Sequence, residues 1–470
     1  MNFDPAFLDY LKAAVGESNV PAVISALSEP ASVSVRLNPF KLRPDETSGL
    51  FGWKGEEVPW NGNALFLPER PQFTLDPLLH AGVYYVQDSS AMFPGFVFRS
   101  AVRTLISENP SSGIRALDLC AAPGGKTTDI ATSLRTLCGD DFLLVSNEIM
   151  KQRAAVLADN AGIWGEPSMV VTSADPAAFS RLAGFFDIIV ADVPCSGEGM
   201  FRKDGEAVAQ WSGDNVELCQ ARQRRIVADV WPALAEGGFL VYSTCTFNNK
   251  ENDDNVGWIA DNLGAEVVGI DFQTSGIMPS RYGKVLIPGL VKGEGQYCAL
   301  LRKTVSSQVS RPVKNRCRRN LKADSVRSAG GISKELKIRL SGLFDRNVEL
   351  LERNGMILAV PEFLCRHLPV IESLGPMMRG TAIGQLKGRD LVPDADLALS
   401  IILAEDAFPK AELAIQEARA FLHRDALMLP DAPKGIVCVT YLGHPLGFVK
   451  NLGSRCNSLH PQHRRIRMDI

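Results

Sequence analysis

The sequence lacks the features of several large protein classes. No uninterrupted apolar run approaches the roughly 18 residues of a membrane-spanning helix, so we expect no membrane partner. The opening residues, MNFDPAFLDYLKAAVGES, contain no basic leader before an apolar block, so we expect no signal peptide. Neither charge sign is in excess, because 50 Lys and Arg face 53 Asp and Glu. This balance argues against a histone-like polycation but leaves room for a local basic surface.

The ten cysteines contain no C-x-x-C pair and are spread over 470 residues. This spacing excludes a disulfide scaffold or a zinc ribbon and favours a reducing, cytoplasmic setting. Cys456, His460 and His463 are three potential ligands without a fourth nearby, so we predict no metal site. The hydrophobic fraction of 46% and the length predict several buried cores, in about three folding units.

From residue 115 onward, apolar strands alternate with helix-length segments. This pattern predicts a doubly wound α/β sheet, in which ligands bind at the carboxyl ends of the strands. We expect strands in RALDLCAAP, DFLLVSNEI, SMVVTSAD, FDIIVADVP, GGFLVYSTCT and GQYCALLRK, and helices over 126–137, 150–164 and 214–235. Outside this region we expect a helix over 7–27, a strand over 33–37, an irregular stretch over 52–71, a helix over 333–353 and a strand in GMILAVPEF.

The first of these strands runs into a glycine-containing turn, Cys120-Ala121-Ala122-Pro123-Gly124-Gly125-Lys126. Glycines at a strand-to-helix turn let a ligand approach the backbone. A phosphate-binding P-loop would need glycine at position 120, which is cysteine, and the adjacent glycine pair does not make a dinucleotide motif. S-adenosylmethionine has no phosphates and needs only a shorter turn. A tight turn without a ligand is the remaining alternative.

Acidic side chains end the next strands. Glu148 ends the second strand, where a carboxylate can accept hydrogen bonds from both ribose hydroxyls of a nucleoside, or can be a solvated charge. Asp175 ends the third strand, where it can face an adenine or cap a loop. The fourth strand delivers Asp192 and then Cys195 into a Pro/Gly loop, and the last one delivers Cys245. A lone buried cysteine is usually a small core residue, but two at neighbouring strand ends indicate chemistry.

Together these segments resemble the RNA 5-methylcytosine methyltransferases of the Nop2/Sun-domain family. The resemblance lies in LDLCAAPGGKT, the Asn-Glu pair ending at Glu148, ADVPCSGEGMFRK and YSTCTF, and covers about residues 80–303. The chain length and tail further resemble the F branch of the bacterial 16S rRNA (cytosine-carbon-5) methyltransferases. Residues 34–39, SVRLNP, resemble the RNA-binding N-terminal part of that family, and VTYLGHPLGFVKNLGSRCNSLHP resembles its PUA-like module.

The resemblance implies a fold and a domain order. The fold class is α/β, a class I (Rossmann-like) S-adenosylmethionine-dependent methyltransferase sheet between an N-terminal α+β RNA-binding part and a C-terminal PUA-like β-rich module. We predict an RNA-binding part over 1–100, the methyltransferase domain over 101–305, a basic linker over 306–330, an intermediate α/β segment over 331–395 and the PUA-like module over 396–470.

The resemblance also assigns roles. It implies that Cys245 adds to carbon-6 of a cytosine, that Asp192 bonds the cytosine edge at nitrogen-3, and that Cys195 assists product release. Lys126 either lowers a thiol pKa or contacts the base, or only caps its helix. DNA cytosine methyltransferases use a Pro-Cys motif like Pro194-Cys195 as the nucleophile, so Cys195 is the alternative. The residues predicted to bind S-adenosylmethionine are Cys120, Ala121, Ala122, Pro123, Gly124, Gly125, Lys126, Glu148, Arg153, Asp175 and Asp192.

Reaching a cytosine requires an unpaired or flipped nucleotide, so basic residues are candidate phosphate contacts. The partner implied is RNA, foremost 16S rRNA or the small ribosomal subunit, acted on by a monomer. A tRNA substrate, a P-loop-like NTPase and an inactive RNA-binding factor are the alternatives. The basic candidates are Arg202, Lys203, the run from Arg311 to Lys322, Lys450, Arg455, Arg464, Arg465 and Arg467.

Overall fold

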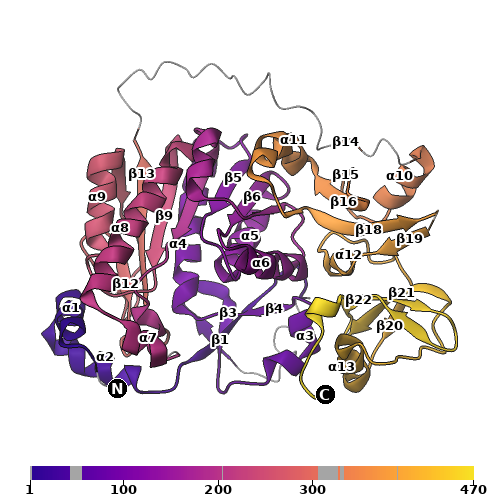
Figure 1. Cartoon of the computed structure of the whole chain (residues 1–470), viewed down its shortest axis with the longest axis horizontal. Helices are drawn as coiled ribbons and strands as arrows, with labels where there is room; N and C mark the ends of the chain where they lie inside the picture. The colour runs from indigo at the N-terminus through magenta and orange to yellow at the C-terminus, as the bar shows by residue number, and fades with distance from the viewer. Residues whose placement is uncertain (1–2, 43–54, 204, 305–326, 329–332, 389) are drawn as a thin grey trace.

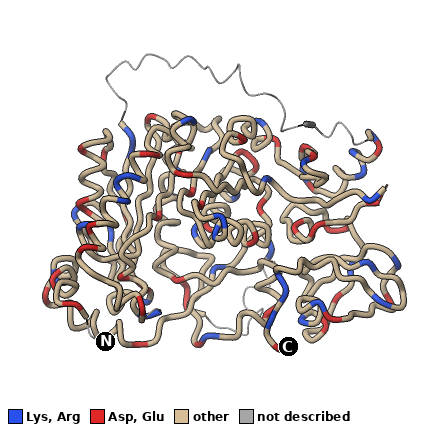
Figure 2. The backbone as a smooth tube through the Cα atoms, viewed as in Figure 1, with Lys and Arg blue, Asp and Glu red and all other residues tan. Residues whose placement is uncertain are grey.

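The computed structural model of the chain describes residues 3–42, 55–203, 205–304, 327–328, 333–388 and 390–470. Of the basic linker predicted over 306–330, only residues 327–328 are described, and the basic run from Arg311 to Lys322 lies outside the described residues. Helices α1 (Pro5–Val15) and α2 (Val20–Leu27) lie at one end of the molecule and the C-terminal strands at the other (Figure 1). Among the described residues, no helix combines the length and apolar character needed to span a bilayer. Basic and acidic residues are interspersed along the whole backbone (Figure 2).

The largest sheet contains a parallel core of five strands. They are β5 (Ile114–Asp118), β6 (Phe142–Asn147), β7 (Met169–Thr172), β8 (Phe186–Asp192) and β9 (Leu234–Thr244). Their order in the sheet is β9-β8-β5-β6-β7, with every neighbouring pair parallel. The chain starts this core in its middle, at β5, so the switch point lies between β5 and β8, where α/β sheets bind ligands.

Antiparallel strands extend this core on both sides. β13 (Gln296–Lys303) pairs with β9, and β17 (Met378–Arg379) adds a short edge beside β7. The predicted class I methyltransferase sheet is therefore confirmed, with strands at all six predicted segments. The remaining strands of this sheet are β10 (Ala265–Val268), β11 (Met278–Pro279) and β12 (Lys284–Leu286).

Helices cover both faces of the sheet because its strands are apolar on both faces. Ala116 and Leu117, neighbours on β5, belong to different hydrophobic clusters on opposite faces. One face carries α4 (Phe93–Glu108), α5 (Gly125–Cys138) and α6 (Lys151–Trp164). The other carries α8 (Gly213–Val230), α9 (Asp253–Leu263) and α11 (Glu362–Ile371), and the short α7 (Gly205–Gln210) precedes α8.

A four-stranded antiparallel sheet forms the N-terminal part. Its order is β2 (Glu56–Val58), β3 (Asn61–Leu67), β1 (Val33–Leu37) and β4 (Tyr84–Val86). This sheet shares a hydrophobic cluster with the C-terminal module, in which Val35 and Leu37 pack with Phe421 and Val449. The two ends of the chain therefore bury apolar surface against each other.

The C-terminal half contains two smaller sheets. One comprises β14 (Arg327–Ser328), β15 (Val348–Arg353), β16 (Met356–Pro361), β18 (Thr381–Lys387) and β19 (Asp390–Pro393). The other comprises β20 (Lys410–Glu412), β21 (Gly435–Tyr441), β22 (His444–Asn451) and β23 (Cys456–Ser458). The helices not yet named are α3 (Pro77–His80), α10 (Lys334–Ser341), α12 (Ala395–Leu399) and α13 (Ile415–His423).

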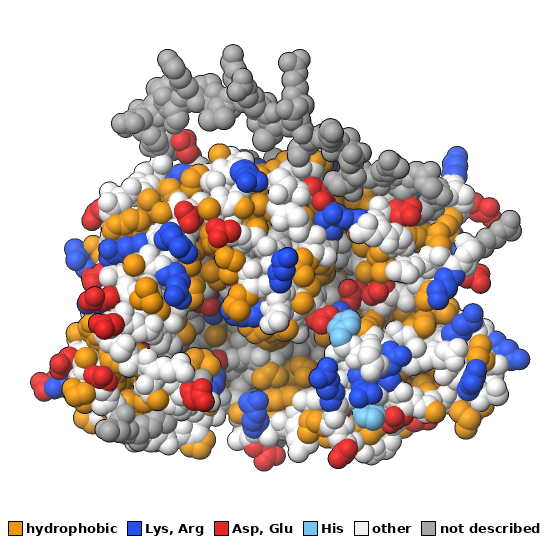
Figure 3. All heavy atoms as spheres, viewed as in Figure 1, with side chains coloured by type: hydrophobic (Ala, Val, Ile, Leu, Met, Phe, Trp, Pro, Cys, Tyr) orange, Lys and Arg blue, Asp and Glu red, His pale blue; other side chains and the backbone are white. Residues whose placement is uncertain are grey.

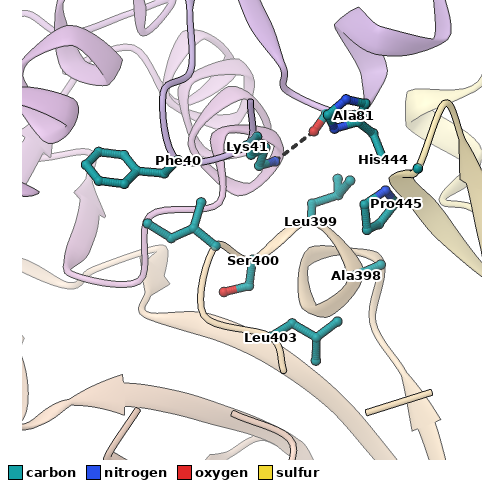
Figure 4. Close-up of a pocket in the computed structure, with 11 residues that line it drawn as sticks. Phe40, Lys41, Ala81, Ala398, Leu399, Ser400, Leu403, His444 and Pro445 are labelled. Atoms are coloured by element: carbon teal, nitrogen blue, oxygen red, sulfur yellow. Dashed lines mark hydrogen bonds between the residues drawn. The ribbon is translucent and has the colours of Figure 1, made fainter. Parts of the chain in front are cut away.

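A cavity of about 190 Å³ marks the junction of these parts (Figure 4). Lys41 lies in the wall of this cavity and donates hydrogen bonds of 2.7 Å to the carbonyls of Ala81 and Ile163. Ala81 directly follows α3, and Ile163 belongs to the last turn of α6. Burial lowers the pKa of Lys41 to about 7. The cavity contains none of the predicted site residues, so we assign it to the joint between the parts.

Three predicted elements differ from the structure. The helix expected over 7–27 is two helices, because Gly16 has a left-handed φ of 77° between them. The stretch over 52–71, expected to be irregular, contains β2 and β3. The helix expected over 333–353 ends at Ser341, and its second half forms β15, which pairs with β16. The predicted domain boundary at residue 100 falls within α4; the division into domains stays a prediction.

Arg36 on β1 connects the N-terminal sheet to the methyltransferase sheet. Its side chain is 1% exposed. It donates to Gln87 at 3.0 Å, to the Gly125 carbonyl at 3.1 Å and to the Thr128 hydroxyl, and it lies over the ring of Trp164. The segment resembling the RNA-binding part therefore turns its arginine inward, onto the first turn of α5.

We expect Arg36→Ala to destabilise the protein strongly. The change leaves the buried Asp129 carboxylate, 4.0 Å from the Arg36 guanidinium, with fewer cationic partners, and removes a bond to the start of α5. Breaking one partner of a buried pair costs about 3–5 kcal/mol. Urea unfolding measures the loss. Arg103→Ala, at an exposed position of α4, is the matched control and should change stability by less than about 0.5 kcal/mol. Equal effects of the two variants would contradict this role.

Candidate active site

The turn between β5 and α5 has the geometry of a ligand-binding turn. Gly124 has φ 117°, which favours glycine, and caps the N-terminus of α5 without a side chain. The Asp118 carboxylate, at the end of β5, accepts a hydrogen bond of 2.6 Å from the Thr127 hydroxyl. Its other oxygen is buried and has no hydrogen-bond partner among the described residues. Burial raises the pKa of Asp118 to about 7.

Residues at the end of β6 bind this turn. The Ala121 amide donates to the Asn147 carbonyl at 2.8 Å. Glu148 is buried and forms an ion pair of 3.2 Å with Arg153, whose guanidinium donates to the Ala122 carbonyl at 3.0 Å. The structure thus brings the predicted turn, Glu148 and Arg153 together.

Two other predicted cofactor residues have different surroundings. Asp175 is exposed and caps a 3-10 helix by accepting from the Ala177 amide at 2.9 Å. The pKa of the Cys120 thiol is raised, chiefly by burial and further by the negative charges of Asp192 and Asp118. A thiol held protonated here lines the turn without being a reagent.

Asp192 stands at the end of β8, where three donors orient its carboxylate. Lys126, from α5, donates to one oxygen at 2.8 Å. The hydroxyl of Ser243 and the side-chain amide of Gln296 donate to the other, at 2.7 and 3.4 Å. Burial alone would lower the pKa of Lys126, but the charge and hydrogen bond of Asp192 outweigh it and raise that pKa. Lys126 therefore stays cationic beside the turn.

The two predicted cysteines meet at this edge of the sheet. The Sγ atoms of Cys195, after β8, and Cys245, after β9, are 2.8 Å apart, and both residues are partly exposed. The hydrogen bond to Cys245 and burial raise the pKa of Cys195 well above its usual value. The Gly199 amide donates to the Cys245 carbonyl at 2.7 Å, which fixes the two loops against each other.

Several residues of this site are not among those predicted from the sequence. Ser243 and Gln296 orient Asp192, and the buried Glu198 and Glu251 lie behind the cysteines. A buried carboxylate has no local sequence signal, because charged residues usually face solvent.

The structure gives two of the predicted RNA contacts internal partners. The side chain of Arg202 is 7% exposed and forms an ion pair of 2.9 Å with Glu294. The side chain of Arg464 is 10% exposed and pairs with Asp159 and Asp396. These two arginines are therefore structural rather than phosphate contacts.

Other basic candidates remain available to solvent. Lys and Arg side chains gather on the visible face of the C-terminal module (Figure 3). Exposed members of this region are Lys450, Arg455, Arg465 and Arg467. Lys203 is partly exposed and lies 3.8 Å from Asp88 and Glu294. Among the described residues, no group of three or more His, Cys, Asp or Glu has the arrangement of a metal site.

The strand order, the glycine turn and the acidic strand ends define a class I methyltransferase. Three family models match separate parts of the chain. The model of the 16S rRNA methyltransferase RsmB/F matches residues 105–302. The model of the N-terminal domain of 16S rRNA methyltransferase RsmF matches residues 3–89, and that of the methyltransferase RsmF PUA domain matches residues 408–466. The chain belongs to this RsmB/F family of methyltransferases, which use S-adenosylmethionine.

Full-length relatives agree with the family models. The chain is 29% identical to ribosomal RNA small subunit methyltransferase F of Salmonella paratyphi A over 495 residues, covering 98% of this chain and 96% of the relative. The enzyme of the same name from Salmonella typhi is also 29% identical, over 485 residues.

Solved structures share the fold of about two thirds of the chain. A methyltransferase homolog from Pyrococcus horikoshii is 24% identical with a TM-score of 0.52, covering 64% of this chain and 99% of that one. NSun6 from the same organism, solved with SFG, is 18% identical with a TM-score of 0.53, covering 65% and 99%. These similarities support the fold assignment.

We expect Asp118→Asn to change how stability depends on pH. The pKa of Asp118 is raised from 3.8 to about 7, so the folded protein binds the proton more tightly than the unfolded chain. Stability from this group is therefore present below about pH 4 and lost as the pH rises to about 7. The asparagine of the variant does not titrate, so its free energy of unfolding should not show this decrease, which is on the order of a few kcal/mol.

Urea unfolding at several pH values checks this prediction. The exposed Asp141→Asn is the matched control and should follow the wild-type pH dependence. Parallel pH profiles for Asp118→Asn and the wild type would contradict the burial argument.

Proposed function

We propose that this enzyme methylates carbon-5 of a cytosine in RNA through a covalent adduct of Cys245. The observation that carries the proposal is the pair of Sγ atoms 2.8 Å apart beside Asp192, on the ligand-binding edge of the sheet. Cytosine carbon-5 is a poor nucleophile, and a thiolate that adds to carbon-6 activates it. A second thiol at the same place serves the reverse step, in which the enzyme is released.

The chemistry of the site fits S-adenosylmethionine. This cofactor supplies an electrophilic methyl group on a positively charged sulfonium. Asp118 offers a carboxylate oxygen without a partner among the described residues. Glu148 and Asp192 add two further carboxylates, which form ion pairs with Arg153 and Lys126. Three carboxylates beside two cations suit a cationic ligand better than a triphosphate, which argues against the NTPase alternative. We propose that Glu148 holds the ribose and that the 120–126 turn, Arg153 and Asp175 complete the binding site.

In the first step, the Cys245 thiolate forms a bond to carbon-6. The carbon-5–carbon-6 π pair forms a double bond between carbon-5 and carbon-4, which displaces the carbon-4–nitrogen-3 π pair onto nitrogen-3. Nitrogen-3 takes up a proton, which balances the proton that the Cys245 thiol lost when it became a thiolate. Asp192 accepts a hydrogen bond from that N–H, which stabilises the charge as it develops. Lys126, Ser243 and Gln296 hold the carboxylate in place, so it needs no reorientation. Carbon-5 thereby becomes enamine-like and can attack the methyl group.

Product release reverses the addition. Water takes the proton at carbon-5, its electron pair re-forms the carbon-5–carbon-6 double bond, and the sulfur–carbon pair returns to Cys245 as a thiolate. Nitrogen-3 then gives up the proton that it took in the first step, and the thiolate becomes a thiol again. A thiol at Cys195 stabilises the departing thiolate by a hydrogen bond, because the two Sγ atoms are 2.8 Å apart. The raised pKa of Cys195 keeps it in the required thiol form.

The cysteine roles predict opposite outcomes for two variants. Cys245→Ala should lower methylation by at least about a thousandfold, because no adduct can form. Cys195→Ala should retain attack and accumulate a covalent RNA adduct. Denaturing gel electrophoresis of enzyme incubated with RNA and S-adenosylmethionine detects the adduct. Cys138→Ala, at the far end of α5, is the control and should behave as the wild type.

One outcome would reverse the assignment. An active Cys245→Ala, together with a Cys195→Ala that forms no adduct, would make Cys195 the nucleophile, as in the Pro-Cys enzymes.

We propose 16S rRNA as the substrate, because the full-length relatives are named small subunit rRNA methyltransferases. Bisulfite sequencing of RNA from cells with and without the gene should show at least one methylcytosine lost from 16S rRNA. Wild-type enzyme should restore it and Cys245→Ala should not. Loss from tRNA alone would favour the tRNA alternative, and no loss in any RNA would exclude the cytosine reaction. Action as a monomer in the cytoplasm stays a prediction.

A further inference from the structure

Two buried glutamates join the loops that carry the cysteines. Glu198 follows Cys195 in the loop after β8, and Glu251 follows Cys245 in the loop after β9. They are 1% and 0% exposed. Each carboxylate accepts backbone N–H groups from the other loop, so the arrangement is reciprocal.

Glu251 is connected to both residues that flank Cys195, directly to Ser196 and through Gln223 to Pro194. The amide of Ser196 donates to its carboxylate at 3.1 Å, and Gln223 donates to it at 2.6 Å. The same Gln223 nitrogen also donates to the carbonyl of Pro194 at 3.0 Å. Residues 194 and 196, which flank the cysteine, are thus fixed to one carboxylate group.

Glu198 makes the corresponding bonds behind Cys245. It accepts from the amides of Phe247 and Asn248 at 2.7 and 3.1 Å, and from the indole of Trp211 at 3.1 Å. The Asn248 side-chain amide then bridges the two glutamates, at 2.9 Å to Glu198 and 2.8 Å to Glu251. Glu251 thus contacts a residue next to Cys195, whereas Glu198 contacts residues that follow Cys245.

No cation among the described residues forms an ion pair with either glutamate, and their donors are neutral amides and an indole. A buried charge without a counter-ion is costly unless it is hydrogen-bonded, and N–H donors reach both oxygens of the Glu251 carboxylate. A neutral glutamine side chain has one acceptor oxygen and could not accept all of these hydrogen bonds. Burial raises the pKa of Glu251, and its hydrogen-bond donors oppose that rise.

The charge acts on Cys195. The hydrogen bond to Cys245, burial, the charge of Cys245 and the charge of Glu251, in this order, raise the pKa of Cys195. The groups facing Cys195 are Cys245 and Glu251 from the second loop, Tyr242 from β9 and the Gly197 backbone of its own loop. Lys126, the nearby cation, interacts with Cys245 instead. The two thiols thus have different charged neighbours.

We propose that Glu251 is a positioning residue that fixes the residues flanking Cys195 and whose buried charge, together with burial and the hydrogen bond to Cys245, makes Cys195 the proton-holding member of the cysteine pair and leaves Cys245 to attack. The division into attack and release rests on the proposed function. The effect on Cys195 itself does not, because it follows from the charge and contacts of Glu251.

The pH dependence of Cys195 alkylation tests this proposal in the full-length protein. Trypsin cleaves after Arg181, Arg202, Arg225 and Lys250, which places Cys195 and Cys245 in separate peptides. Mass spectrometry after iodoacetamide treatment therefore reports each thiol separately, without RNA or cofactor. Glu251→Gln should move the Cys195 midpoint to lower pH by about one unit, which is roughly a tenfold faster alkylation below the midpoint.

Glu198→Gln is the matched control, because it removes an equally buried charge that bonds the loop of Cys245. Its Cys195 midpoint should stay at the wild-type value. Glu251→Asp serves as a second variant should Glu251→Gln not fold. It keeps the charge but withdraws the carboxylate from Cys195 by one methylene, so it should shift the midpoint in the same direction by less.

Two results would overturn the proposal. One is an unchanged Cys195 midpoint in Glu251→Gln or, where that variant does not fold, in Glu251→Asp. The other is an equal shift in Glu198→Gln, which would indicate general loosening of the loops. An inactive wild type in the methylation assay would refute the proposed function while leaving the alkylation result valid.

Discussion

The ion pair between Lys126 and Asp192 joins the two halves of the active site. Lys126 belongs to the first turn of α5, which follows the glycine turn, and Asp192 ends the neighbouring strand β8. The carboxylate proposed to bind the cytosine edge is thus anchored to the helix that follows the glycine turn. Lys126 also interacts with Cys245, so one cation connects Asp192 with the proposed nucleophile.

Support for that helix comes from outside the methyltransferase sheet. Arg36 reaches from the N-terminal sheet to the Gly125 carbonyl and the Thr128 hydroxyl. The N-terminal sheet shares a core with the C-terminal module, and Arg464 near the chain end pairs with Asp159 on α6. The flanking parts therefore help to hold the site, in addition to any contact with RNA.

The two cysteines illustrate how a fold places one residue type in two environments. They meet because β8 and β9 are parallel neighbours and each places a loop at the same edge. Lys126 interacts with Cys245, whereas the charge of Glu251 acts on Cys195. The proposed division into a nucleophile and a proton holder rests on this difference in surroundings.

The sequence by itself determined the sheet, the glycine turn and the positions of Asp192, Cys195 and Cys245, because apolar strands have a clear pattern and parallel strand ends share an edge. It did not determine the partners of buried charges. Arg202 and Arg464 read as surface cations, yet Arg464 and Asp159 pair across 305 positions. Tertiary structure alone decided this, and it also buried Glu198 and Glu251. Burial depends on contacts between distant segments, and no local pattern records which distant group compensates a charge.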